Sequence, residues 1–359
     1  MKIPHLHVWT RIALTMFLCS PSFVAAQNDE TGADTGANPL FSSHSVLNVL
    51  IEAPITQLMQ ERSDKRYLNG KLRYTDTAGV AHTLDLKLRT RGKYRNQKKT
   101  CSFAPIRLNF RKKQVAGTEF AGQDKLKLVT HCKIGSDRYE QLVLKEYLAY
   151  QSLEILTEKS FRTRLLRVTY LNSQNSEDSV TRFAFVIEDK SDIGDRIGLS
   201  PENIPKINYA DLDRRQANLV SVFQYMIGNT DYSMIRGALN DDCCHNIELL
   251  ANDDGLYTPI PYDFDFAGVV NAPYAEPNPK LKISSVRVHY YRGRCTNNEL
   301  LEETVAYIHE HEAEIHALVD NLDGLEENYR KDFNDYLNVY FDRVSTPKKL
   351  ERHFSKKCS

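Results

Sequence analysis

The spacing of the apolar residues changes near Asp189, and this change limits the folds that are open to the chain. Before Asp189, apolar residues recur at every second position, as Leu84, Leu86 and Leu88 do between charged neighbours. This two-residue period is typical of an antiparallel strand with one buried face. The same pattern predicts strands over 70–74, 80–89, 105–110, 125–129, 165–170 and 182–187.

Helical spacing is rare in the first half of the chain and dominates the second half. Before Asp189 it occurs over 139–156, where Leu142, Ala149 and Leu153 fall on one stripe. The chain is therefore predicted to be an α+β protein, with its strands concentrated before its helices. After Asp189 we expect helices over 211–227, 298–319 and 325–344, and short strands over 245–250 and 257–260.

The first residues have the features of a secretory signal. Lys2 and Arg11 accompany a short apolar run, and Val-Ala-Ala at 24–26 matches the small-residue pattern at a signal-peptidase site. We therefore expect a signal peptide over 1–26 and a disordered polar leader over 27–40. The mature protein would be secreted or periplasmic, with no membrane span.

The cysteines that follow the signal are even in number, which predicts disulfides in an exported chain. Adjacent cysteines rarely bond to each other, so we expect Cys243 and Cys244 to pair elsewhere. The favoured pairs are Cys101 with Cys132, and Cys295 with Cys243 or Cys244, although the sequence does not determine them.

The segment 227–268 carries the residues that are best suited to chemistry. It contains Ile-Gly-Asn-Thr-Asp ending at Asp231, Cys-His-Asn ending at Asn246, and Tyr-Asp-Phe-Asp, which includes Asp263 and Asp265. The two short strands predicted between Asn246 and Asp263 would form a hairpin. A hairpin would return both side chains to the same cleft.

Phosphoryl transfer needs a small set of protein groups of this kind. One carboxylate orients the attacking hydroxyl, while an amide oxygen and a second carboxylate hold Mg²⁺ against the phosphates. Because Mg²⁺ prefers oxygen ligands and keeps several waters, one or two carboxylates suffice. The order Asp231, Asn246, Asp263 matches a kinase catalytic loop followed by its metal-binding aspartate.

These motifs resemble those of the CotH family of spore-coat kinases and, more distantly, the HipA and phosphoinositide-kinase-like folds. Two upstream motifs extend the resemblance. Arg-Thr-Arg-Gly at 89–92 is similar to the family's Arg-x-Arg-Gly turn, and Lys-Glu-Tyr-Leu-Ala-Tyr at 145–150 is similar to its Arg-Asn/Glu-x-Leu-Ala-Tyr helix. The resemblance implies a protein-kinase-like two-lobed fold, with an antiparallel β-rich N-lobe over 41–190 and a mainly helical C-lobe over 191–359.

The resemblance also implies a reaction and a set of site residues. A phosphoryl group would pass from ATP, bound with Mg²⁺ or Mn²⁺, to a hydroxyl-bearing acceptor that is a protein or a small molecule. Asp231 would be the catalytic aspartate. Asn246 and Asp263 would bind the metal, with Asp265 as the neighbour of Asp263.

Four further residues are candidates for binding the nucleotide. Lys127 lies on a predicted strand nineteen positions before Glu146, a spacing that would allow the two to pair under the phosphates. Arg107, on the preceding strand, competes with Lys127 because the corresponding strand of CotH relatives carries a basic residue. We favour Lys127. Glu188, between the two expected lobes, would mark the hinge that meets the adenine ring.

The sequence leaves other interpretations open. The chain could be a kinase-like scaffold without catalysis, because ATP is scarce outside the cytoplasm, or it could transfer AMP. A metal-dependent hydrolase that used Asp263 and Asp265 would lack the histidines that such sites recruit. Tyr-Tyr-Arg-Gly-Arg at 290–294 could bind a phosphate or an acidic partner, although we interpret it as a loop held by Cys295.

Several functional classes find no support in the sequence. Lys plus Arg and Asp plus Glu both number 47, so net charge gives no reason to expect binding to nucleic acid or to an anionic membrane. No P-loop, dinucleotide fingerprint or Gly-x-Ser-x-Gly elbow occurs. The His309 to His316 segment lacks the His-Glu-x-x-His spacing of a zinc helix.

Overall fold

The computed structural model describes residues 1–2, 38–175, 177–237, 241–252 and 254–359. Residues 38–359 form one compact unit. The predicted signal peptide beyond residue 2 and the predicted leader up to residue 37 lie outside the described residues. The end of the expected leader is ordered, because Leu40 is buried within the 3₁₀ helix Pro39–Phe41.

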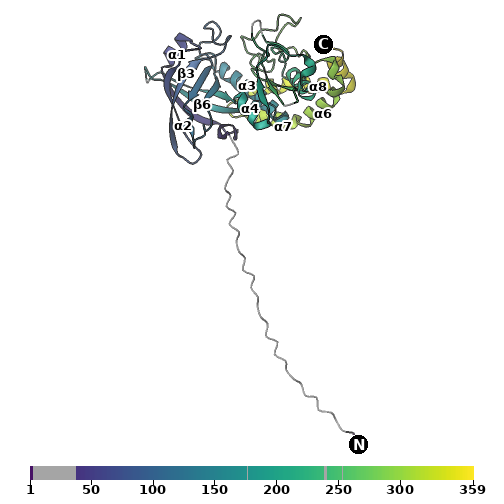
Figure 1. Ribbon diagram of the computed structural model, residues 1–359, viewed down its shortest axis with the longest axis horizontal. Helices are drawn as coiled ribbons and strands as arrows, with labels where there is room; N and C mark the ends of the chain where they lie inside the picture. Colours follow the sequence, from purple (N-terminus) through teal and green to yellow (C-terminus); the bar gives the residue numbers. More distant parts are fainter. Residues whose placement is uncertain (3–37, 176, 238–240, 253) are drawn as a thin grey trace. The chain divides into compact units, whose positions relative to one another are not determined.

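Seven strands close into a β-barrel that makes up the first half of the unit 38–359 (Figure 1). Neighbouring strands pair antiparallel, except for β1 and β6, which run parallel with Leu47 opposite Leu166. The alternating leucines of β3, Leu84, Leu86 and Leu88, are buried in the barrel core. The strands are β1 (Leu47–Ala53), β2 (Leu68–Thr75), β3 (Ala81–Thr90), β4 (Ile106–Phe110), β5 (Lys125–Val129), β6 (Thr163–Asn172) and β7 (Ser179–Ile187).

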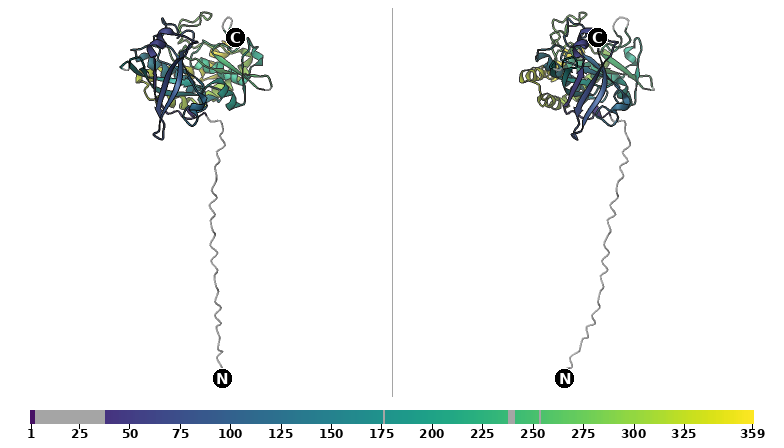
Figure 2. Two further views of the ribbon diagram at one scale, coloured as in Figure 1. Left: turned by 60° about the vertical axis from the view of Figure 1, so that its left-hand side comes forward. Right: turned by 90° about the vertical axis from the view of Figure 1, so that its left-hand side faces the viewer.

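The second half of the unit combines a small sheet with helices. Its antiparallel sheet has the strand order β10-β9-β8. Helix α3 packs against β7 of the barrel and against α7, and so lies between the barrel and the C-terminal helices (Figures 1 and 2). The remaining elements are α1 (Ile55–Glu61), α2 (Lys112–Val115), α3 (Arg138–Leu156), α4 (Lys190–Ile197), β8 (Ser200–Glu202), η2 (Tyr209–Asp211), α5 (Arg214–Met226), β9 (Ile247–Ala251), β10 (Tyr257–Pro261), η3 (Cys295–Leu300), α6 (Leu301–Glu310), α7 (Glu312–Asp320), α8 (Glu327–Val344), α9 (Pro347–Leu350) and η4 (Glu351–Ser355).

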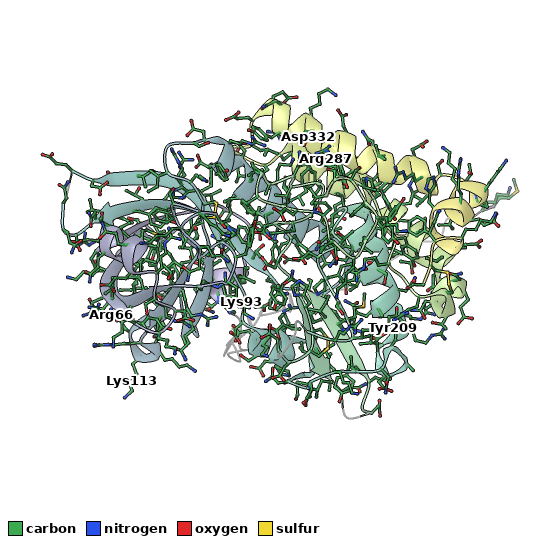
Figure 3. All side chains as sticks on the ribbon, turned by 90° about the horizontal axis from the view of Figure 1, so that it is seen from above. Arg66, Lys93, Lys113, Tyr209, Arg287 and Asp332 are labelled. Carbon is green, nitrogen blue, oxygen red and sulfur yellow. A yellow bond between two sulfur atoms is a disulfide. The ribbon has the colours of Figure 1, made fainter. Side chains whose placement is uncertain are left out.

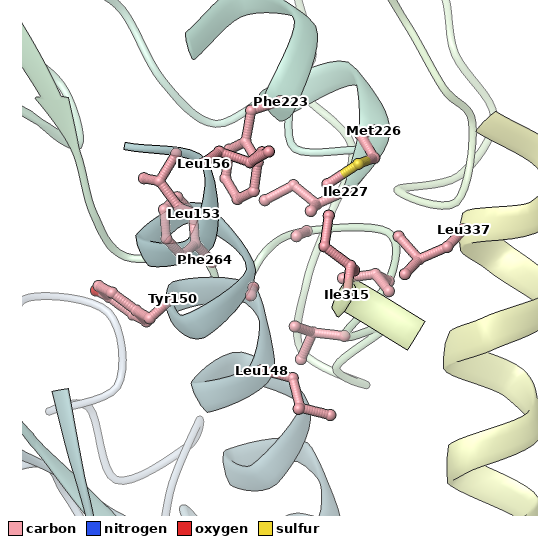
Figure 4. Packing of buried hydrophobic residues seen from close by; sticks show 14 of the residues in the cluster. Leu148, Tyr150, Leu153, Leu156, Phe223, Met226, Ile227, Phe264, Ile315 and Leu337 are labelled. Carbon is pink, nitrogen blue, oxygen red and sulfur yellow. The ribbon is translucent and has the colours of Figure 1, made fainter. Parts of the chain in front are cut away.

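Helix α3 is the centre of the larger hydrophobic core. Its residues Leu148, Leu153 and Leu156 belong to one buried cluster with Phe223 of α5 and Phe264, which follows β10 (Figure 4). Burial of such side chains is worth about 1.5–3 kcal/mol each. The packing therefore fixes α3 against the segments that follow α5 and β10.

An ion-pair network ties α3 to helix α8. The buried Lys145 ammonium of α3 lies 2.7 Å from a carboxylate oxygen of Asp332 on α8. Arg287 contacts the same carboxylate at 3.0 Å, and Arg287 and Asp332 lie next to each other in Figure 3. A buried lysine is costly unless it is paired, so this contact fixes how α8 meets α3.

The predicted protein-kinase-like two-lobed fold is wrong, whereas the α+β class is confirmed. The expected antiparallel N-lobe over 41–190 is a closed, mixed barrel. No strand is predicted over the residues of β1, and the parallel pairing of β1 with β6 is what closes the sheet. The expected mainly helical C-lobe over 191–359 also contains the β8–β10 sheet.

Most of the individual elements agree with the sequence predictions. Each strand expected before Asp189 overlaps one of the strands β2 to β7, and the helix expected over 139–156 is α3. The helix expected over 298–319 is broken at His311 into α6 and α7. In the part of the chain that is described, no helix is both long enough and apolar enough to cross a membrane.

Three disulfides join the cysteines of the described residues. Cys101 bonds Cys132, as predicted. The expected pairing of Cys295 with Cys243 or Cys244 is wrong, because those two neighbours bond each other and Cys295 bonds Cys358. Backbone hydrogen bonds between 293–295 and Ser359 bring the last residues alongside Cys295. Three disulfides are consistent with a secreted or periplasmic location.

Candidate functional site

Two loops that are distant in sequence lie side by side at the end of α5. Gly268 and Val269 donate backbone hydrogen bonds to the carbonyls of Gly228 and Ile227, at 3.1 and 3.0 Å. Gly228 has a φ of +68°. A methyl group at Gly228 or at Gly268 would overlap the hydroxyl of Tyr336. Glycine is therefore required at both positions, and the contact brings the Asp231 loop next to the loop that carries Asp263.

The carboxylate of Asp231 is held by two neighbouring side chains. His245 Nε2 lies 2.8 Å from Asp231 Oδ1, and Asn246 Nδ2 donates to Asp231 Oδ2 at 3.1 Å. Asn246 Nδ2 also lies 2.7 Å from the backbone carbonyl of Asp231. The hydrogen bond that His245 donates to the Asp231 carboxylate is the main reason why the pKa of His245 is raised above its usual value of 6.5.

Asn246 and Asp263 both have left-handed backbone conformations, with φ of +53° and +63°. Such angles are uncommon outside glycine, and asparagine and aspartate tolerate them best. The Asp263 backbone amide donates to the hydroxyl of Tyr150 at 2.8 Å, and Tyr150 lies on α3. Unusual backbone angles that the surrounding structure holds in place are concentrated at functional sites.

One cavity of about 680 Å³ brings the acidic and amide groups together. Asp231, Asn246, Asp263 and Asp265 all line it.

Cationic side chains line the same cavity. Lys93, which follows β3, forms an ion pair with Asp241 of the opposite loop, with 2.7 Å between Nζ and Oδ2. Figure 3 shows Lys93 between the two halves of the unit. The cationic residues that line the same cavity are Arg91, Lys93, Arg95 and Lys190.

A buried charge cluster lies behind Asp263. Asp265 is 5% exposed, and its Oδ2 accepts a hydrogen bond from the Tyr274 hydroxyl at 3.1 Å. Burial, and then the charge of Asp263, raise the pKa of Asp265 to about 7. Burial also raises the pKa of Glu146 well above its usual value.

Arg95 is the counter-ion of this cluster. Its Nη1 lies 3.6 Å from Glu146 Oε2 and 3.9 Å from Asp265 Oδ2. Arg95 also donates to the carbonyl of Thr130. The side chain is itself buried, so a permanently charged guanidinium is shared between two buried carboxyl groups.

The expected ion pair between Lys127 and Glu146 does not form, since Arg95 takes the place of the lysine. Lys127 Nζ instead lies over the rings of Tyr262 and Phe161, 5.0 and 5.5 Å from their centroids. Burial, followed by the nearby charge of Arg91, lowers the pKa of Lys127 to about 8. Lys127 thus lies against Tyr262, which lines the cavity.

The two remaining candidates for nucleotide binding, Arg107 and Glu188, do not line this cavity. Arg107 lies directly opposite Lys127 in the β4–β5 register, and burial is the main cause of its lowered pKa. Glu188 is buried and bonded to Arg196 at 2.9 Å, and it accepts from the Arg162 amide at 3.0 Å. The structure therefore does not place Glu188 among the residues that line the cavity.

Arg91, Arg95 and His245 line the cavity but are not among the predicted site residues. Arg91 lies in the Arg-Thr-Arg-Gly motif and His245 immediately precedes Asn246, so local motifs could have indicated both residues. Arg95 lies in an irregular segment, where no period shows which way a side chain points. Comparison of the sequence with protein-family models and with curated proteins finds no match to this chain.

Proposed function

We propose that this protein transfers a phosphoryl group from ATP, bound with Mg²⁺ or Mn²⁺, to a hydroxyl-bearing acceptor. The observation that supports the proposal is the shared cavity, in which Asp231, Asn246 and Asp263 face the same space as Arg91 and Arg95. Carboxylates and an amide suit a metal ion, and cationic side chains suit phosphates.

Asp231 is the proposed base. The acceptor oxygen forms a bond to the γ-phosphorus while the bond from that phosphorus to the bridging oxygen of ADP breaks. The acceptor's proton passes to the Asp231 carboxylate and then to solvent. His245 and Asn246, which contact Asp231 at 2.8 and 3.1 Å, orient that carboxylate.

Asn246 and Asp263 are the proposed metal-binding residues. Their side-chain oxygens are the hard ligands that Mg²⁺ and Mn²⁺ accept, and their left-handed backbones hold them at the cavity wall. Among the described residues, no group of three or more His, Cys, Asp or Glu side chains is arranged to hold an ion. The site would therefore bind a cation together with phosphate oxygens, as Mg²⁺ sites commonly do. The bound ion would neutralise charge on the phosphates.

The cationic wall is the proposed site for the phosphates. Arg91 and Arg95 offer planar donors that match phosphate oxygens, while Lys93 and Lys190 add charge at the cavity edge. Arg95 is held by Glu146, so it would be oriented before the nucleotide arrives. Lys127, which packs on the ring of Tyr262, would add its positive charge to that of these residues.

A nucleotide-binding protein without catalysis is the second candidate. Both carboxylate oxygens of Asp231 are already hydrogen-bonded, Oδ1 by His245 and Oδ2 by Asn246. These two hydrogen bonds leave fewer free acceptor sites on the carboxylate for the proton of a hydroxyl acceptor. Release of labelled phosphate onto an acceptor distinguishes the two candidates, because a binding protein would show nucleotide-dependent stability without turnover.

Thermal unfolding with and without nucleotide and metal tests the proposal. ATP with Mg²⁺ or Mn²⁺ at one hundred times its Kd should stabilise the protein by about 2.7 kcal/mol. Asp263→Ala should remove the metal-dependent part of this stabilisation and leave the free protein folded. Asp254→Ala, in the exposed β9–β10 turn, is the matched control and should respond as the wild type does. Absence of stabilisation with every nucleotide and metal pair would refute the proposal.

A further inference from the structure

A second cavity, of about 690 Å³, adjoins the first at the pair Asp231 and His245, which line both cavities. Its walls come from 232–237, 276–281 and 290–294. The sequence run Tyr-Tyr-Arg-Gly-Arg at 290–294 therefore lines a cavity rather than serving as a loop held by Cys295 alone. A ligand in this second cavity would therefore reach Asp231 from a cavity that Arg91 and Arg95 do not line.

The second cavity is strongly cationic. Five basic side chains line it, whereas its acidic lining residues are Asp231, which is paired with His245, and Glu276. In the part of the chain that the structure describes, none of the five forms an ion pair with a carboxylate. Unpaired cations gathered around one hollow create a positive potential that favours an anionic ligand. The five are Arg236, Lys280, Arg292, Arg294 and Lys357.

Two of the arginines are already held in place by the protein. Arg292 donates to the backbone carbonyl of Thr230 at 2.8 Å, and its guanidinium lies 4.7 Å from the centroid of the Tyr232 ring. Arg294 lies over the Tyr209 ring at 5.5 Å. Stacking on aromatic rings limits the freedom of the side chains, so less entropy is lost when they bind a carboxylate.

The walls between these cations are apolar, and both aliphatic side chains and aromatic rings contribute to them. They include Met234, Ile235, Pro277, Pro279, Leu281, Phe266, Tyr290 and Tyr291. A ligand that fills it must pair anionic groups with apolar groups, because aliphatic surface left in contact with water gains nothing on binding. An acidic peptide with apolar side chains carries both kinds of group, whereas an anionic glycan has no aliphatic side chains to pack on Met234, Ile235 and Leu281. Clusters of arginine are also a recurring means of binding acidic peptide motifs.

We propose that the second cavity binds an acidic peptide segment and presents its serine or threonine hydroxyl to Asp231. The identity of the acceptor rests on the phosphoryl transfer proposed above, whereas the binding of the peptide does not. The peptide hydroxyl would lose its proton to Asp231 as its oxygen bonds to the γ-phosphorus, and ADP would leave.

Peptide binding tests the inference directly. Two fluorescent peptides of equal length carry a central serine and leucines, one with flanking glutamates and the other with flanking lysines. We expect the acidic peptide to bind more tightly and to weaken as salt is raised. Lys280→Glu combined with Lys357→Glu, at two exposed positions, should weaken acidic-peptide binding about tenfold or more. Lys282→Glu is the matched control, because Lys282 is exposed and does not line the cavity.

The outcomes separate the inference from the proposed function. Stabilisation by ATP and metal is measured in the same variants and should not change. Equal affinity for the two peptides, or equal loss in Lys282→Glu, overturns the inference. Tighter binding of an anionic glycan that displaces the acidic peptide overturns the peptide assignment. If the acidic peptide binds and the double variant weakens that binding, but the serine is not phosphorylated with ATP, the binding site is supported. The same result counts against the transfer reaction.

Discussion

Replacing Asp265 by asparagine should make the protein more stable at neutral pH. Asp265 is 5% exposed, and burial and Asp263 raise its pKa from 3.8 to about 7. In the unfolded chain the carboxyl ionises near 3.9. Below about pH 4 the group is neutral in both states. Between about pH 4 and 7 only the unfolded state is ionised, so the folded state loses stability as the pH rises.

The size of the effect follows from the two pKa values. One pH unit of difference is worth about 1.4 kcal/mol, so the full cost of ionising Asp265 in the folded protein is ~4 kcal/mol at most. Asparagine has nearly the same shape and keeps an oxygen that can accept from Tyr274, at the 3.1 Å position of the present hydrogen bond. It also leaves the contact between Arg95 and Glu146 in place.

Urea unfolding at several pH values, without metal and with disulfides intact, measures this effect. The gain in unfolding free energy from Asp265→Asn should increase by about 2–3 kcal/mol between pH 5 and pH 8. Asp323→Asn, at an exposed position, is the control and should show no such dependence on pH. A variant that is no more stable than the wild type at pH 8, or a gain equal at both pH values, would refute the reasoning.

Two further predictions follow from the same loops. The hydrogen bond to Asp231 is the first cause of the raised pKa of His245. The stability that protonated His245 contributes is therefore complete below about pH 6.5, and it is lost as the pH rises through the raised pKa of the folded state. The stability advantage of the wild type over His245→Gln should therefore be larger at pH 5.5 than at pH 8.5 in urea unfolding, and an advantage that grows with pH would contradict this. Gly228→Ala should cost about 2–4 kcal/mol, because its methyl group overlaps the Tyr336 hydroxyl and φ is +68°. Tyr336→Phe in the same chain should recover part of the loss, and full additivity of the two changes would show that the clash is not its cause.

The positions of β2 to β7 are predicted from the sequence, whereas β1 is not predicted and the closure of the barrel could not be. In β1, Leu47, Val49 and Ile51 alternate with less buried residues, as they do in the other strands. What closes the barrel is the parallel pairing of Leu47 with Leu166, and the two lie far apart in the chain. Periodicity specifies which face of a strand is buried and gives no information about which distant strand becomes its neighbour.

The acidic half of the candidate site could be predicted because its residues lie at the ends of local elements. Asp231 follows α5, and Asn246 and Asp263 flank the β9–β10 hairpin, whose register pairs Ile247 with Pro261. A hairpin is a local structure, so residues at its two open ends are necessarily close. The sequence spacing therefore carried enough information to bring Asn246 and Asp263 together.

The basic half could not be predicted, because it depends on which cation is able to remain charged beside two buried carboxyl groups. Burial lowers the pKa of Lys127 to about 8, so a buried lysine loses its proton more readily and is a weaker counter-ion. A guanidinium stays charged when it is buried, and its several donors can serve Glu146, Asp265 and the Thr130 carbonyl at once. The arginine that does this is Arg95, which lies in an irregular segment. Its position follows from packing and charge, and not from a spacing along the chain like the nineteen residues between Lys127 and Glu146.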